Sequence, residues 1–252
     1  MSALDITILA PAMIAGLLVL STHVLLGREV LSRGIIFIDL AVAQIAGLGV
    51  MAAAAFGWHP HGVTAQLAAV AAAMAGGVLL TWTEGRFEKV QEAIIGAVFV
   101  LAATAGIILL ANHPRGGEEL RELLIGQILW VDRHNLVPAA AVSAVVVASW
   151  LTARERLGRA GFYLLFALSV TVSVQLVGVY LVFASLILPA LATRNEPERR
   201  ALPIAYGTGA AGYALGLVLS ALLDLPTGAV IVWSLALVSA ATALLTSRRP
   251  HT

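Results

Sequence analysis

The residue that bears most directly on function is Asp39, which lies within the apolar run from Gly34 to Gly57. We expect this run to form one membrane-crossing helix. A carboxylate at the centre of a lipid-embedded helix costs about 2.5–3.5 kcal/mol, so it is usually kept facing a bundle interior or a water-filled path. Asp39 is therefore predicted to line a route through a membrane. The alternative is a buried carboxylate bonded to a hydroxyl or backbone group of a neighbouring helix.

Other polar positions are candidates for contact with a cation on that route. Gln44 lies five residues after Asp39 and either lines the route or makes an interhelical hydrogen bond. Asp224 stands in LLDLPTG, where it is either a turn carboxylate or a contact for the ion. His59 and His61 lie in GWHPHG at a spacing that suits either a cation or a solvated turn.

The available ligand types limit the chemistry of any metal site. The chain has 0 Cys, which excludes thiolate ligands and disulfides. A bound cation therefore needs carboxylate, imidazole, amide or water ligands. His23 lies in the first predicted helix, where we expect a packing role, and His113 is a weaker candidate than the other histidines.

Composition identifies the setting as a membrane. Hydrophobic residues make up 60% of the 252, charged residues 12%, and the mean hydropathy is +0.95, whereas soluble domains carry about 25% charged residues. The apolar blocks are long enough to cross a bilayer as helices and lack the alternation of barrel strands. We predict an all-α, polytopic transmembrane bundle with 8–9 passes, forming a single transmembrane domain over residues 1–252.

Nine apolar segments are expected to cross the membrane. The stretch from Gly161 to Ala192 is too long for one pass, and Gly178 and Pro189 offer places to break it, which leaves the count at eight or nine. A further apolar piece, LLIGQILWV, is too short to span and is expected to lie at the interface or dip back into the membrane. The predicted passes are Ile6–Leu26, Gly34–Phe56, Thr64–Trp82, Ala93–Ala111, Leu136–Thr152, Gly161–Val177, Gly178–Ala192, Ala201–Leu222 and Gly228–Thr246.

The distribution of cations predicts the orientation. With the N-terminus outside, most of the basic residues fall in cytoplasmic loops and at a cytoplasmic C-terminus, as the positive-inside rule requires. The first segment has no basic stretch before it and is expected to be retained rather than cleaved. The cytoplasmic cations are then Arg28, Arg33, Arg86, Lys89, Arg154, Arg156, Arg159, Arg194, Arg199, Arg200, Arg248 and Arg249.

The chain has no motif for ATP hydrolysis. A phosphate-binding loop needs GxxxxGK[ST], and the only lysine is Lys89 in RFEKVQ. No cofactor is expected in this chain, and any ATPase that drives transport is expected to be a separate subunit.

Five segments together resemble the membrane permease of zinc/manganese-type metal ABC transporters. The resemblance implies a homodimer of permeases in the lipid bilayer, two cytoplasmic ATP-binding ATPases and an extracytoplasmic metal-binding protein, with no nucleic-acid partner. It also implies a divalent metal ion, zinc, manganese or iron, as the transported substrate. The segments are REVLSRGIIFIDLAVAQIAGLG, QEAIIGAVFVLAATAGIILL, GGEELRELLIGQILWV, VTVSVQLVGVYLVFASLILPALATR and LLDLPTGAVIV.

The sequence departs from that family at one position. Permeases of the family commonly carry a histidine four residues after the aspartate of the second helix, so that both ligands share a helical face. Here Ala43 occupies that position and Gln44 follows it. Loss of the nitrogen ligand weakens the case for zinc and leaves the choice of metal open.

The resemblance also predicts where an ATPase docks. The segment ARERLGRAG, which contains Arg154, Glu155, Arg156 and Gly158, precedes the apolar segment before which the family places that contact. Thr83–Glu92 is the alternative dock, and a plain basic loop is the alternative to both.

Two other functional classes stay open. An iron-chelate or corrinoid ABC permease would use a wider, less charged path. An ATP-independent secondary carrier or channel is disfavoured because the chain shows no clear internal repeat and few intramembrane charges. A structural membrane protein would leave Asp39 unexplained.

Overall fold

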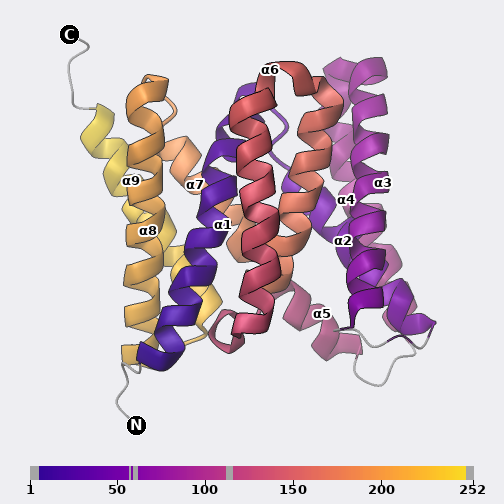
Figure 1. Ribbon diagram of the computed structural model, residues 1–252, viewed down its shortest axis with the longest axis horizontal. Coiled ribbons are helices and arrows are strands. Elements are labelled where there is room, and N and C mark those ends of the chain that lie inside the picture. The colour runs from indigo at the N-terminus through magenta and orange to yellow at the C-terminus, as the bar shows by residue number, and fades with distance from the viewer. Residues whose placement is uncertain (1–5, 57, 59–61, 112–115, 248–252) are drawn as a thin grey trace.

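The computed structural model describes residues 6–56, 58, 62–111 and 116–247, and every regular element in those ranges is a helix (Figure 1). The all-α prediction is thereby confirmed for the described residues. In chain order the elements are α1 (Ile6–Arg33), α2 (Ile38–Ala55), α3 (Val63–Phe87), η1 (Glu88–Val90), α4 (Gln91–Leu110), α5 (Gly116–Ile125), η2 (Ile128–Trp130), α6 (Arg133–Val177), α7 (Val179–Ala192), α8 (Glu198–Leu223) and α9 (Thr227–Ser247).

Six helical stretches in the described ranges are long and apolar enough to cross a membrane. The two longest are each divided: Val63–Leu110 turns back at η1, and His134–Val177 turns back at Gly158. The short helix α7 has 14 residues, which gives it a length of about 21 Å, less than the roughly 30 Å of a hydrocarbon core. The number of membrane passes stays a prediction.

Several helices extend beyond the predicted apolar segments. α1 continues to Arg33 rather than ending at Leu26, and α3 continues to Phe87 rather than Trp82. Hydropathy marks only the part of a helix that lipid can cover, while Arg and Glu are good helix formers outside it. α2 differs in the other direction, since it begins at Ile38, four residues later than expected.

The segment predicted to be a separate loop, residues 153–161, is instead the bend of α6. Helix continues on both sides of Gly158, whose φ of 57° and ψ of −159° belong to a region that essentially only glycine occupies. The predicted passes Leu136–Thr152 and Gly161–Val177 form the two arms of this helical hairpin (Figure 1). The expected cytoplasmic loop is therefore a tight turn.

A second glycine separates α6 from α7. Gly178 has φ of 83°, and the helix breaks there as predicted, whereas Pro189 lies inside α7 without ending it. The backbone of Gly126, which also has positive φ, contacts Val177 and Gly178 so closely that neither glycine has room for a Cβ. α5, below the α6–α7 junction in Figure 1, is thus joined to it backbone to backbone.

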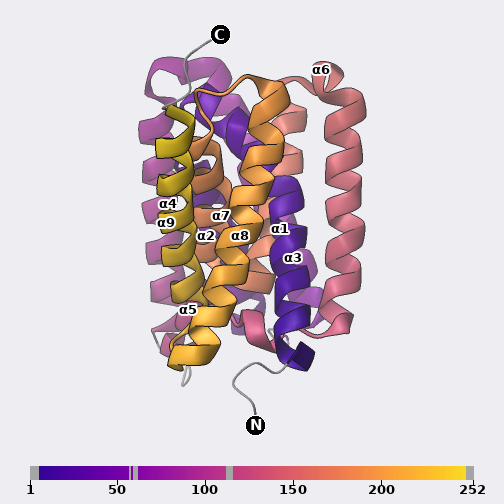
Figure 2. The ribbon, with the colours of Figure 1, turned by 90° about the vertical axis from the view of Figure 1, so that its left-hand side faces the viewer.

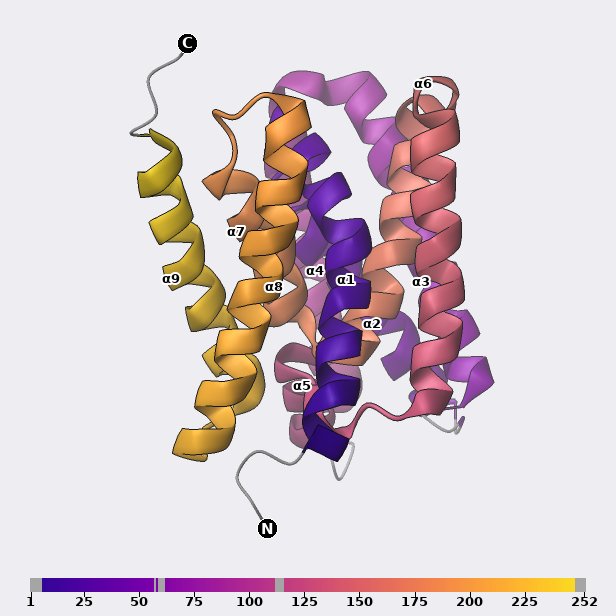
Figure 3. The same cartoon turned by 60° about the vertical axis from the view of Figure 1, so that its left-hand side comes forward.

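Helix α1 lies at the centre of the bundle, where it packs against α6, α7 and α8, while α2 packs against α3 and α4 and also contacts α6 and α7 (Figures 1 and 3). Small residues permit these approaches, as is usual between membrane helices. Gly27 of α1 contacts the carbonyl of Leu186 in α7, and Gly76 of α3 packs on Ile45 of α2.

The two ends of the bundle differ in the elements they present. α1 begins and α9 ends at opposite ends (Figure 2). The end of α1 that carries Arg33, the end of α3 and the bend of α6 lie together, because ion pairs join Arg33 to Glu84 and Arg159 to Glu84. The opposite end holds α5 and the α8–α9 connection (Figure 1).

We expect Gly178→Ala to lower the free energy of unfolding by more than about 1 kcal/mol, because alanine at positive φ is strained and its Cβ would meet the backbone of Gly126. Thermal unfolding of the detergent-purified chain measures this. Gly207→Ala is the matched control: nothing lies within 4 Å of its Cβ position, and in mid-helix the change should stabilise by about 0.5–1 kcal/mol. Equal melting temperatures for the two variants would contradict the close contact.

Candidate functional site

The candidate site begins at the turn between α1 and α2. Gly34 has φ of 69°, and its N–H donates to the carbonyl of Leu31 at 3.3 Å, while the N–H of Ile35 donates to Val30 at 3.3 Å. This is a Schellman motif, which satisfies the last carbonyls of a helix and needs a left-handed residue. The motif ends α1 and reverses the chain within a few residues.

The start of α2 is held from another helix. Phe37 is the N-cap residue of α2, and its side chain makes no capping hydrogen bond. Instead its backbone N–H donates to Oε1 of Glu92 in α4 at 3.1 Å. A carboxylate at a helix N-terminus also interacts favourably with the helix dipole. Glu92 therefore fixes where α2 begins.

Asp39 lies in the first turn of α2 rather than in the middle of the helix. It is 0% exposed, and neither Oδ1 nor Oδ2 has a hydrogen-bond partner among the described residues. Buried carboxylates are normally paired, because an unpaired one loses its hydration without compensation. An unpaired carboxylate inside a bundle has the ligand chemistry that a divalent cation needs.

Gln44 is also buried in α2, at 4% exposure. Five residues of α-helix rotate a side chain by about 140°, so Gln44 and Asp39 leave α2 on different faces. Ala43, which stands where the resembled family has histidine, is fully buried and is the residue nearer to the face of Asp39. The amide of Gln44 and the carboxylate of Asp39 therefore do not lie on the same side of α2.

Asp224 lies elsewhere. It is exposed, it caps α8 in a left-handed conformation with φ of 53°, and its N–H donates to the carbonyl of Ser220. It caps the end of α8, and the α8–α9 connection lies at the end of the bundle where α1 begins (Figure 1). In the described ranges no group of three or more His, Cys, Asp or Glu is placed to hold a metal ion. His59, His61 and His113 lie outside the described residues.

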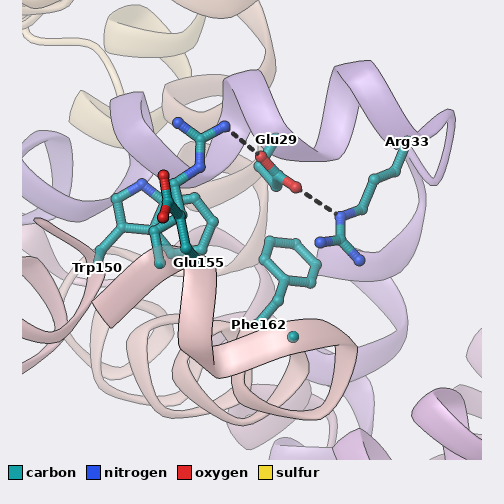
Figure 4. Close-up of a pocket in the computed structure, with 7 residues that line it drawn as sticks. Glu29, Arg33, Trp150, Glu155 and Phe162 are labelled. Atoms are coloured by element: carbon teal, nitrogen blue, oxygen red, sulfur yellow. Dashed lines mark hydrogen bonds and ion pairs between the residues drawn. The ribbon is translucent and has the colours of Figure 1, made fainter. Parts of the chain in front are cut away.

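The bend of α6 forms a pocket of about 360 Å³ with the end of α1 (Figure 4). Three of the predicted ATPase-coupling residues, Arg154, Glu155 and Gly158, line it, whereas Arg156 is exposed and does not. The remaining lining residues are Glu29, Arg33, Trp150 and Phe162.

Two carboxylates and three arginines hold this corner together. Oε1 of Glu29 pairs with Nε of Arg33 at 2.8 Å, and its Oε2 pairs with Arg154 at 2.9 Å (Figure 4). Glu84 of α3 lies 3.7 Å from Arg33 and 3.9 Å from Arg159. The side chain of Glu84 is only 11% exposed, so solvent screens these pairs less than ordinary surface pairs.

Aromatic side chains support the same arginines. The guanidinium of Arg33 lies 4.3 Å from the ring centroid of Phe162, and that of Arg154 lies 5.2 Å from the ring of Trp150. Both distances are within the range of cation–π attraction. The pocket is therefore a charged and aromatic corner whose side chains are joined by ion pairs and ring contacts.

Glu29, Glu84 and Glu92 were not singled out from the sequence. The four-residue spacing of Glu29 and Arg33 on one helix is a readable signal for their pair. Glu84 lies inside Thr83–Glu92, the alternative dock, and its approach to Arg159 shows that the two candidate coupling segments contact one another. No sequence signal links Glu92 to Phe37.

The sequence pattern of the ABC 3 transport family matches residues 5–162 and 154–246 of this chain. The chain belongs to this family. The two matched ranges overlap at residues 154–162, which form the α6 bend and its flanks. As an ABC 3 family protein with several long apolar helices, it is a multi-pass membrane protein.

Known proteins resemble this ABC 3 family protein over different lengths. An uncharacterized membrane protein of Synechocystis sp. is 26% identical over 253 residues, covering 91% of this chain and 88% of that protein. A Haemophilus influenzae protein named "Probable iron transport system membrane protein" is 25% identical over 163 residues, covering 56% of this chain and 60% of that protein.

A solved structure, "PsaBC from Streptococcus pneumoniae in complex with Fab", has a TM-score of 0.75 with this ABC 3 family protein at 20% identity. The match covers 93% of this chain and 90% of that chain. At this level of identity the likeness shows a shared fold.

Proposed function

We propose that this ABC 3 family protein is the permease subunit of an ABC transporter that imports a divalent metal ion, zinc, manganese or iron, across the cytoplasmic membrane. The observation that carries the proposal is Asp39, a fully buried carboxylate whose two oxygens have no partner among the described residues. Family membership supports the transporter class, and the name of the Haemophilus influenzae relative supports a metal substrate.

The carboxylate acts by replacing water around the cation. A divalent ion that leaves bulk water needs oxygen or nitrogen ligands at each stage, and an anionic ligand offsets the cost of bringing its charge into a low-dielectric bundle. Asp39 provides that charge at the start of α2, where the Schellman turn and Glu92 hold the helix in place. Gln44, on another face of α2, and Asp224, at the far end, are further proposed contacts along the route.

We expect Asp39→Asn to reduce ATP-dependent metal uptake to less than about a tenth, because the amide keeps the volume and loses the charge. Uptake of zinc, manganese and iron by proteoliposomes that contain the permease and its ATPase measures this. Asp132→Asn is the matched control, since Asp132 only caps α6 through the N–H of Asn135 and asparagine caps equally well. Unchanged uptake by Asp39→Asn would contradict the assignment of Asp39 to the ion path. No uptake of any metal by the wild type would contradict the proposed function itself.

We further propose that the energy comes from two separate cytoplasmic ATPases that dock on a permease homodimer, with an extracytoplasmic protein delivering the metal. The α6 bend supports this assignment because its pocket is lined by charged and aromatic side chains, among them Arg154 and Glu155, which are exposed. Arg154, Glu155, Arg156 and Gly158 are the proposed coupling residues, and Thr83–Glu92 is the adjoining surface.

Reversal of charge at the bend, Arg154→Glu with Glu155→Arg and Arg156→Glu, should weaken copurification with the ATPase. It should lower metal-stimulated ATP hydrolysis more steeply, because several surfaces share docking but the bend transmits the motion. Pull-down and ATPase assays on the same preparations separate the two effects. Arg199→Glu with Arg200→Glu, at the exposed start of α8, is the control. Intact assembly and intact stimulation in the triple variant would assign coupling to Thr83–Glu92.

The proposed orientation places the α6 bend in the cytoplasm. Cations gather at that end of the bundle, on the end of α1, the end of α3 and the bend itself, as the positive-inside rule requires of a cytoplasmic face. The N-terminus is then outside and the C-terminus inside, and Arg248 and Arg249 lie outside the described residues.

Alkaline phosphatase is active only after export, so fusions report the side of the membrane. A fusion after His61 should be active and one after Arg156 inactive. Green fluorescent protein at the same two positions should give the opposite pattern and serves as the control. Reversed activities would place the α6 bend outside and exclude it as an ATPase contact.

A further inference from the structure

Besides Asp39, the buried side chain of His23 has a polar atom without a hydrogen-bond partner among the described residues. His23 of α1 is 0% exposed, and it is the one buried histidine among the described residues. Its Nδ1 lies 2.9 Å from the carbonyl oxygen of Val19 and 3.0 Å from Oγ1 of Thr22. Its Nε2 is buried and has no hydrogen-bond partner in the described part of the chain.

The anchoring of Nδ1 determines the chemistry of Nε2. A carbonyl oxygen can only accept, so Nδ1 carries the proton and donates it to Val19. A neutral ring then leaves the lone pair on Nε2, since a buried imidazolium without a counter-charge would be unfavourable. Histidines that bind metals usually have this arrangement, with one ring nitrogen donating to a backbone carbonyl and the other free for the metal.

A second layer of contacts fixes the ring from α6. Oγ of Ser169 donates to Oγ1 of Thr22 at 2.8 Å, and Thr22 donates to Val19 at 3.2 Å. If His23 only filled space, an apolar side chain would do so without burying an unpaired nitrogen. The ring is thus held at Nδ1 with its other nitrogen left available.

The position of His23 relates it to the path proposed for α2. One turn along α1, Gly27 contacts the carbonyl of Leu186 in α7, so this face of α1 lies against α7, while Thr22 lies against α6. α2, which carries Asp39, also packs against α6 and α7. α1 and α2 therefore flank the same pair of helices, each with a buried, unpaired group of metal-ligand type.

We infer that His23 is a ligand for the transported divalent metal ion, which it binds through Nε2, and that α1 thereby supplies the imidazole that Ala43 leaves missing from α2. The inference rests on the proposed function. Imidazole nitrogen favours zinc over manganese, whereas carboxylate oxygen suits manganese. His23 therefore makes the path more favourable for zinc than the sequence of α2 alone indicates.

Two substitutions separate ligation from packing. In His23→Asn the amide N–H can still donate to Val19, but nothing replaces Nε2. In His23→Gln the longer side chain brings an amide oxygen near the position of Nε2 and gives up the bond to Val19. Zinc and manganese uptake by the complete transporter in proteoliposomes is measured as KM and maximal rate, with melting temperature recorded on the same samples.

If His23 binds the metal, His23→Asn should raise the KM for zinc by about tenfold or more and the KM for manganese by less. His23→Gln should partly restore manganese uptake.

If the ring only packs, His23→Asn should be the milder variant and both metals should change together, which would overturn the inference. Failure of the wild type to transport either metal would instead count against the proposed function. Should both variants unfold, Thr22→Val replaces them, because it removes the hydroxyl that links the ring to Ser169 of α6. Zinc is then titrated against Mn²⁺ bound to the permease, and the rise of the free Mn²⁺ electron paramagnetic resonance signal measures the zinc preference. An unchanged zinc preference in this variant also overturns the inference.

Discussion

The structure depends on the need of every backbone polar group for a partner in an environment without water. Within lipid a chain can reverse direction only where the ends of its helices are satisfied internally. Glycine serves at three of the helix ends and bends: Gly34 closes a Schellman motif, Gly158 bends α6, and Gly178 separates α6 from α7 against the backbone of Gly126. α3 instead turns into α4 through η1, and Asp224 caps α8. Because positive φ strains other residues, these glycines determine where α1 ends, where α6 bends and where α7 begins.

Charge is distributed in two ways on this framework. At the α6 bend the carboxylates of Glu29 and Glu84 are paired with arginines and backed by aromatic rings. Inside the bundle Asp39 and His23 have polar atoms without partners among the described residues. Paired charge makes a rigid surface, and unpaired buried groups are costly unless a ligand uses them. The two regions thus suit the two tasks proposed for them, contact with a partner and passage of an ion.

Much of the fold could be predicted from the sequence. The apolar blocks predict the helices. The stretch from Gly161 to Ala192 is too long for one pass and contains a glycine, which predicts the break at Gly178. The bounds were less accurate, because Arg33 and Phe87 continue helices past the reach of lipid. The charged segment 153–161 predicts a loop, whereas its Ala, Arg, Glu and Leu residues favour the helix that the structure shows on both sides of Gly158. Pairs distant in sequence, such as Phe37 with Glu92 and Thr22 with Ser169, depend on helix packing and leave no local pattern.

The turn at Gly34 has a mechanical consequence. On one side of it, Arg33 is tied to α3 and to the α6 bend; on the other side, Glu92 ties the first amide of α2 to α4. Five residues of chain, 34–38, lie between Arg33 and Asp39, and the backbone of Ile36 as well as that of Phe37 hydrogen-bonds to Glu92. A displacement of the α6 bend relative to α4 would therefore fall on residues 34 and 35, and Gly34 would be the hinge between the corner proposed to contact an ATPase and the carboxylate proposed to bind the ion.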